Sequence, residues 1–141
     1  MANILGFLNP LTNHLVTYQL PKGAYMNSEF FIQYVDDLIH QINGTNVLIL
    51  DNASWHKSAL TQSRYKEWES KGLYLFFLPP KCPHLNLIET LWRKIKYEWL
   101  FINDYASDKA LQKKLNHIFK TYGLNYCIEF SMNIFKEKIN R

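Results

Sequence analysis

A continuous aliphatic run that ends in a carboxylate constrains the fold of this chain more than any other feature. Val47-Leu48-Ile49-Leu50 leads directly into Asp51. Four consecutive apolar residues between turn-forming residues predict a strand, from Asn46 to Asp51, that is buried on both faces in the middle of an α/β sheet. Leu73–Leu78, which Pro79-Pro80 ends, predicts a second strand of the same kind.

The remaining segments predict helices and a hairpin around these strands. The expected elements are a β-hairpin at Ala2–Leu8 and His14–Leu20, a helix that Asn27 or Ser28 caps and that ends at Gly44, and helices at Ser58–Lys71, Leu85–Phe101 and Ala106–Phe119. In the tail, Cys127–Phe130 is compatible with a short strand and Asn133–Ile139 with a helix. This order of elements predicts one α/β domain.

Composition excludes several classes of protein. The 141 residues suit one domain, and 48% hydrophobic with 16% aromatic residues exclude intrinsic disorder. The apolar stretches are too short to cross a bilayer, and the N-terminus lacks the basic stretch of a signal peptide. Cys82 and Cys127 form neither a disulfide framework nor a zinc pattern. We therefore expect a cytoplasmic protein without a membrane partner, and we expect Cys127 to be buried.

Two carboxylates are candidate catalytic or metal-binding residues. Asp51 lies at the carboxyl end of a predicted strand, where sites form in open α/β sheets, although a capping or turn aspartate fits this position equally well. Glu89 lies in a predicted helix between Ile88 and Trp92, although a helical glutamate is normally solvated. If the two converge, their oxygens can bind hard cations such as Mg²⁺, and paired ions promote phosphoryl transfer.

The residues around both carboxylates resemble the bacterial insertion-sequence transposases of the mariner superfamily. The segment Leu48–Ser58 (LILDNASWHKS) is similar to the motif that carries their second aspartate. The segment Phe77–Trp92 (FLPPKCPHLNLIETLW) is similar to the motif that carries their third acid. Both motifs occur in the family's order, and the likeness extends from the strand at Ile4 to the helix that ends at Leu100.

The resemblance implies a ribonuclease H-like fold with an Asp-Asp-Glu triad that binds two Mg²⁺ or Mn²⁺ ions. In the family these ions activate water, and then a DNA 3′-hydroxyl, for strand cleavage and transfer. Asp51 would be the second acid and Glu89 the third, each a catalytic residue and a metal ligand. The motif residues that shape the site, or fix the loop and helix presenting Glu89, would be Asn52, His56, Pro80, Asn86 and Trp92. Departures from the family's commoner residues occur at Lys81, Cys82, His84 and Leu87.

The charge distribution agrees with a double-stranded DNA partner. The net charge is +4, and from Arg93 onward ten basic residues face five acidic ones. Arg93, Lys94 and Lys96 are candidate contacts to DNA phosphates, with a solvated helix face as the alternative. A DNA partner would place the protein at the nucleoid.

The family's first aspartate lies on a central strand that precedes the hairpin. The aspartates within residues 1–50 are Asp36 and Asp37, which we expect on a solvated helix face. We therefore expect residues 1–141 to be a partial catalytic domain, from a truncated copy or a split reading frame. Its fold would be ribonuclease H-like without the first, central strand, and N-terminal helix-turn-helix domains would be absent. The exposed strand edges would need an upstream segment or a second copy as partner, and the chain alone would be weakly stable.

The leading hypothesis is therefore DNA transposition by the C-terminal portion of a DDE transposase that is inactive without its first aspartate. Whether the chain by itself is an enzyme stays open. One alternative is a non-catalytic DNA-binding or interaction remnant of a transposase. A more distant alternative is a metal-dependent phosphatase or nuclease with a similar sheet.

Overall fold

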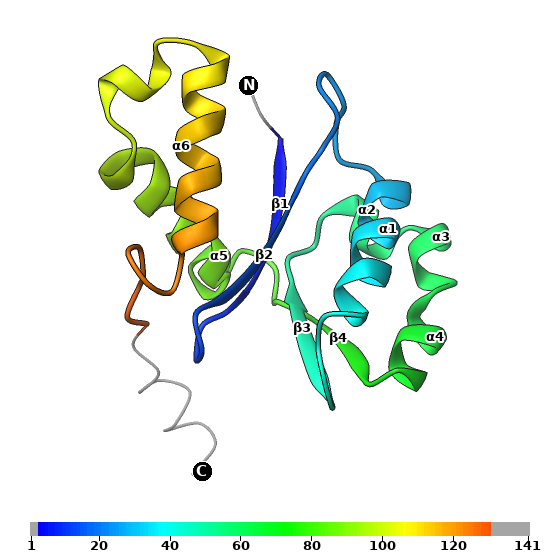
Figure 1. The fold of residues 1–141 in the computed structure, drawn as a ribbon. Coiled ribbons are helices and arrows are strands. Elements are labelled where there is room, and N and C mark those ends of the chain that lie inside the picture. Colours follow the sequence, from blue (N-terminus) through cyan, green and yellow to red (C-terminus); the bar gives the residue numbers. More distant parts are fainter. Residues whose placement is uncertain (1–2, 131–141) are drawn as a thin grey trace.

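The computed structural model describes residues 3–130, which form a mixed α/β structure (Figure 1). The elements are β1 (Ile4–Asn9), β2 (His14–Gln19), α1 (Ser28–Ile39), β3 (Asn46–Leu50), α2 (Ser54–Lys57), α3 (Ala59–Gln62), α4 (Tyr65–Ser70), β4 (Leu73–Phe77), α5 (Leu87–Lys94) and α6 (Asp108–Thr121). The hairpin β1–β2 stands between two groups of helices, α1 to α4 on one side and α5 with α6 on the other. Within the described residues, no helix is long and apolar enough to cross a membrane.

The predicted hairpin is confirmed. β1 and β2 pair antiparallel, with Phe7 opposite Val16. The turn forms because the Asn9 side chain accepts hydrogen bonds from two backbone N–H groups and Asn13 adopts a left-handed backbone at φ 58°. Alternation along the strands sends Phe7 toward α1 and Leu8 toward α5 and α6, so both faces of the hairpin are packed.

The two aliphatic runs also form strands, but they do not belong to one sheet with the hairpin. β3 pairs parallel with β4 in a separate two-stranded sheet. The prediction that these strands are buried on both faces is wrong, since Val47 is 60% exposed and Phe76 56%. Leu50 and Leu73 are buried against α1 and α4, whereas no described element covers the opposite face.

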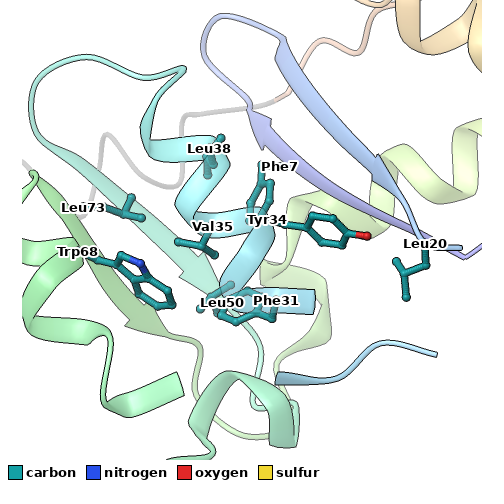
Figure 2. Close-up of a cluster of buried hydrophobic side chains, with 9 residues drawn as sticks. All are labelled: Phe7, Leu20, Phe31, Tyr34, Val35, Leu38, Leu50, Trp68 and Leu73. Carbon is teal, nitrogen blue, oxygen red and sulfur yellow. The ribbon is translucent and has the colours of Figure 1, made fainter. Parts of the chain in front are cut away.

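Helix α1 holds the first core together. Asn27 caps it by accepting a hydrogen bond from the N–H of Phe30, as the sequence predicted. Figure 2 shows α1 side chains between the hairpin and the β3–β4 sheet. The buried cluster comprises Phe7, Leu20, Phe31, Tyr34, Val35, Leu38, Leu50, Trp68 and Leu73. The hairpin and the parallel sheet thus share one core although no strand joins them in the described part of the chain.

A second core lies on the other face of the hairpin. α5 packs on β1, and α6 covers α5. The fully buried side chains of this cluster are Leu91 and Ile118, with Ile95, Leu115 and Ile128 nearly so. α6 begins at the predicted cap, because the Ser107 hydroxyl accepts a hydrogen bond from the N–H of Ala110.

Four predicted segments differ in detail. The helix expected to end at Gly44 already ends at Ile39, with His40 as its C-terminal cap. The single helix expected over 58–71 is broken into α3 and α4, with α2 before them, because Ser58 takes an extended backbone and caps α3. The helix expected from Leu85 begins at Leu87, after a 3-10 turn, and passes into a π-helical turn at Ile95–Trp99. Residues 127–130 form no strand, and Cys127 is exposed rather than buried. The helix expected at 133–139 lies outside the described residues.

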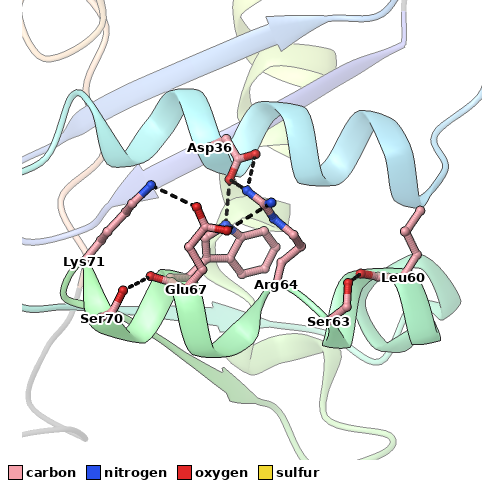
Figure 3. Close-up of polar contacts among 8 residues, drawn as sticks. Asp36, Leu60, Ser63, Arg64, Glu67, Ser70 and Lys71 are labelled. Atoms are coloured by element: carbon pink, nitrogen blue, oxygen red, sulfur yellow. Dashed lines mark hydrogen bonds and ion pairs between the residues drawn. The ribbon is translucent and has the colours of Figure 1, made fainter.

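The expectation that Asp36 lies on a solvated helix face is wrong. Its carboxylate accepts hydrogen bonds from Arg64 at 2.9 and 3.0 Å and from the Trp68 indole nitrogen at 2.8 Å (Figure 3). Arg64 also pairs with Glu67 at 3.0 Å. A long-range arginine and a buried indole leave no signal in the local sequence of α1. The carboxylate therefore ties α1 to α4 above the first core.

We expect Asp36→Ala to lower the free energy of unfolding by about 1–3 kcal/mol, because it leaves the arginine and the indole N–H without their acceptor. Urea denaturation monitored by tryptophan fluorescence measures the change. The matched control is Glu69→Ala, an exposed acid on α4, which should shift the midpoint very little. An equal shift for both variants would contradict the assigned role of Asp36.

Candidate active site

Asp51 follows the last residue of β3, at the position predicted from the sequence. Its Oδ1 accepts a hydrogen bond from the backbone N–H of Ala53 at 3.1 Å, which forms a tight turn at the strand end. His56 Nδ1 lies 3.1 Å from the same Oδ1 and 3.1 Å from the Asp51 carbonyl oxygen. One carboxylate oxygen is thus held by two donors, while Oδ2 has no hydrogen-bond partner among residues 3–130.

His56 is held by the first core. It is 7% exposed, and its ring lies 4.6 Å from the Phe31 ring of α1 and 5.9 Å from the Trp55 ring. Both Asp51 atoms near Nδ1 are acceptors, so this nitrogen carries the hydrogen. Burial lowers the pKa of His56, and the adjacent Asp51 offsets part of this effect. The neutral ring therefore fixes the orientation of the Asp51 carboxylate.

Asn52 joins the ends of the two parallel strands. Its Nδ2 donates a hydrogen bond to the Leu78 carbonyl oxygen at 2.8 Å, directly after β4. The carboxyl ends of β3 and β4 are thereby held together where the chain turns toward the second motif. The sequence motif placed Asn52 near the site, but its contact to Leu78 is a tertiary feature.

Glu89 is exposed in the first turn of α5, with its backbone N–H donating to the Asn86 carbonyl oxygen at 3.1 Å. Leu91 of the same helix faces the opposite way, since it is fully buried in the second core. Asn86 is the N-terminal cap residue without a side-chain capping bond, and Pro80 is exposed in the loop before α5.

Gly6 is a positioning residue that the motif analysis missed. A Cβ at Gly6 would come within 2.9 Å of the Trp92 ring and 3.4 Å of the Ile88 side chain. The absence of a side chain on β1 thus lets α5 approach closely and presents Glu89 beside the hairpin. A glycine inside a strand pattern is the sequence signal for such an approach.

The two candidate acids are held by different parts of the molecule. Asp51 is fixed to β3 and the first core, whereas Glu89 is carried by α5 on the hairpin and the second core. Within residues 3–130, no group of three or more histidine, cysteine, aspartate or glutamate side chains is placed to bind a metal ion. Each acid offers carboxylate oxygens, the donors that Mg²⁺ and Mn²⁺ prefer.

The basic residues after Glu89 differ in their surroundings. Lys94 is half-buried and pairs with Glu98 at 2.7 Å, so part of its charge is compensated. Arg93 and Lys96 are exposed, and the Lys96 ammonium lies 5.2 Å from the Tyr97 ring centroid. Arg93 and Lys96 therefore remain candidates for phosphate contacts, whereas Lys94 is less available.

Comparison with known proteins identifies the family. A family model described as "DDE superfamily endonuclease" matches residues 2–112. The chain is also 38% identical over 66 residues to the uncharacterized protein y4pE/y4sA of Sinorhizobium fredii. This match covers 47% of the chain and 41% of that relative.

We expect stability to depend on pH through His56. Because burial lowers its pKa below the ordinary value of 6.5, the unfolded chain binds a proton more readily than the folded chain. The stability that the neutral ring contributes is fully present above pH 6.5 and is lost as the pH falls below it. Urea denaturation at about pH 7.5 and about pH 5.5, on either side of the ordinary histidine pKa, measures this loss.

The variant His56→Phe keeps an aromatic ring but cannot take up a proton, so the difference between the two pH values should shrink. Exposed His40 provides the control, since His40→Asn should keep the difference seen in the wild type. An unchanged difference in His56→Phe would show that other groups cause the pH dependence.

Proposed function

The chain belongs to the DDE superfamily of endonucleases, and we propose that it is the catalytic portion of a DNA transposase of the insertion-sequence type in the mariner superfamily. The proposed reaction is divalent-metal-dependent cleavage and transfer of DNA strands at the ends of a mobile element. Residues 1–141 would form part of a catalytic domain that acts on double-stranded DNA. The chain spans 41% of the length of the rhizobial relative, which is itself uncharacterized.

The observation that carries this proposal is the way in which hydrogen bonds hold the Asp51 carboxylate. One of its oxygens is fixed by the Ala53 N–H and by His56, and Oδ2 points to no other described group. An oriented, half-exposed carboxylate at the carboxyl end of a strand is the expected arrangement for a ligand to a hard cation. A turn aspartate would need the bond from Ala53 alone, so the additional buried histidine favours a functional role.

Asp51 and Glu89 are the residues that would hold the metal ions. When bound, divalent ions stabilise the attacking and leaving oxygens of a phosphoryl transfer. His56 keeps the second oxygen of Asp51 available by occupying the first, and Asn52 holds the strand ends that flank the carboxylate. Gly6 sets how closely the helix bearing Glu89 approaches the hairpin.

A third acid would come from a strand supplied by an upstream segment or a second copy. The N–H of Leu20 donates a hydrogen bond to the carbonyl oxygen of Asn3. Because the peptide groups along an antiparallel strand face its partner at every second residue, those of Ile4, Gly6 and Leu8 face away from β2. No described strand pairs with that edge of β1.

Strand β3 also has an edge that pairs with no strand in residues 3–130. The N–H of Asn46 donates a hydrogen bond to the carbonyl oxygen of Gly72, and the N–H of Leu78 donates one to the carbonyl oxygen of Leu50. The peptide groups of Val47 and Ile49 therefore face away from β4, where the described residues contain no partner strand. A strand added to these edges would use the hydrogen-bonding groups that they expose.

The test is Mg²⁺-dependent nicking of DNA that carries the ends of the element, by this chain together with the upstream segment. We expect Asp51→Asn and Glu89→Gln each to reduce nicking by more than about 100-fold, which exceeds the effect of losing an outer-shell partner of a metal ligand. Both substitutions keep side-chain size and remove the charge that a cation needs.

Glu69→Gln is the control, because it removes an exposed carboxylate of α4 that lies outside both motifs. Nicking by this variant should match that of the wild-type complex. Full nicking activity in the Asp51 or Glu89 variant would show that the assigned acids are wrong.

A second candidate function is a DNA-binding remnant without catalysis. The placement of Asp51 on the first core and of Glu89 on α5 and the second core favours it, because catalysis needs the two acids to converge. A complex that binds element-end DNA but shows no nicking with either Mg²⁺ or Mn²⁺ would support this alternative.

A further inference from the structure

Lys57 lies in the segment of the first motif, and no role was assigned to it from the sequence; in the structure it belongs to a cluster beside the Asp51 site. It is the last residue of α2, and its ammonium nitrogen lies 2.5 Å from Oδ1 of Asn52. The same nitrogen lies 4.5 Å from the ring centroid of Phe77, the last residue of β4. An amide oxygen and an aromatic face thus hold the cation at the carboxyl ends of β3 and β4.

The orientation of Asn52 is itself determined by the fold. Because its Nδ2 donates to the Leu78 carbonyl oxygen, its Oδ1 must face Lys57. The backbone of Lys57 is fixed as well, since its carbonyl oxygen accepts a hydrogen bond from Gln62 Nε2 at 2.6 Å. Much of the side-chain entropy that a surface lysine loses on binding a ligand is therefore already lost here.

Lys57 retains an uncompensated positive charge. In the described residues it forms no ion pair, whereas Lys71 pairs with Glu67 and Lys94 with Glu98. An ammonium group has three donors, and Asn52 accepts from one of them. The side chain is exposed, so the remaining donors can reach an anion in solution.

We propose that Lys57 binds a phosphodiester group of DNA beside the Asp51 carboxylate. This inference rests on the proposed function for its ligand, and it adds a binding residue that the charge pattern of the C-terminal part did not indicate. Asn52 acts as a positioning residue, because it orients the ammonium through Oδ1 while fixing the strand ends through Nδ2. The contact fixes the register of the DNA backbone and reads no base.

A purely structural role for Lys57 makes a different prediction. If the ammonium served only to tie Asn52 and Phe77 together, its loss would change stability but not the salt dependence of DNA binding. A phosphate contact releases about one counterion, so its loss makes the negative slope of log K against log salt concentration shallower by about 0.9. The salt slope therefore separates the two roles.

The experiment measures binding of the 141-residue chain to a fluorescent DNA duplex by anisotropy, in EDTA and over a series of salt concentrations. We expect Lys57→Gln to weaken binding about threefold to tenfold and to make the negative salt slope shallower by about 0.9. Lys57→Arg keeps the charge and should retain the wild-type slope. Asn52→Ala should weaken binding while the slope changes less than in Lys57→Gln.

The matched control is Lys66→Gln, which removes one exposed lysine charge from α4. It should change affinity less than twofold. Equal effects of the Lys57 and Lys66 variants, an unchanged slope in Lys57→Gln, or no DNA binding by the wild-type chain would each overturn the proposal. Urea denaturation of each variant shows whether it is folded.

The binding assay contains no divalent metal, so its outcome is independent of catalysis. Lys57-dependent binding without nicking by the complete complex would contradict the transposase proposal and leave the Lys57 site standing. Nicking that depends on Asp51 but not on Lys57 would support the transposase proposal and contradict the Lys57 site.

Discussion

The packing of α1 against two separate sheets is the interaction on which the rest of the structure depends. Two-stranded sheets are marginal by themselves, and the hairpin and the β3–β4 pair share no strand in residues 3–130. Phe31 and Val35 are fully buried between them, and Tyr34 stacks on Tyr18 of the hairpin at 4.7 Å. The Asp36 carboxylate adds a polar link from α1 to α4. One amphipathic helix thus makes a single core out of two small sheets.

The candidate site is an extension of this core. Phe31 contacts the ring of His56, and His56 holds one oxygen of Asp51. The orientation of an exposed carboxylate is therefore determined by a buried residue of α1. Asn52 and Lys57 complete the arrangement on the strand side, where a hydrogen bond to Leu78 closes the ends of β3 and β4. A rigid scaffold of this kind is what a positioned metal ligand requires.

Local patterns in the sequence predicted the features that depend on local chemistry. The hairpin, the Asn27 cap and the strand ending at Asp51 all follow from short-range propensity and side-chain type. Predictions failed where distant residues decide the environment. Asp36 looked solvated because its partners Arg64 and Trp68 are remote in sequence. The two aliphatic strands looked buried on both faces, but no described element covers one of these faces.

By itself, the sequence determined the hairpin, the two aliphatic strands, the helices α1, α5 and α6 and the two motifs that carry Asp51 and Glu89, because hydrophobic periodicity and turn residues act over a few positions. Tertiary structure alone decided that the aliphatic strands form a separate pair with one exposed face. It also decided which donors hold Asp51, and that Lys57 contacts Asn52 and forms no ion pair within residues 3–130. The physical reason is that burial and hydrogen-bond partners depend on elements far apart in the chain. Gly6 and Trp92 show the same dependence: they are 86 positions apart in the sequence, yet they pack together and so determine how α5, the helix of Glu89, lies on the hairpin.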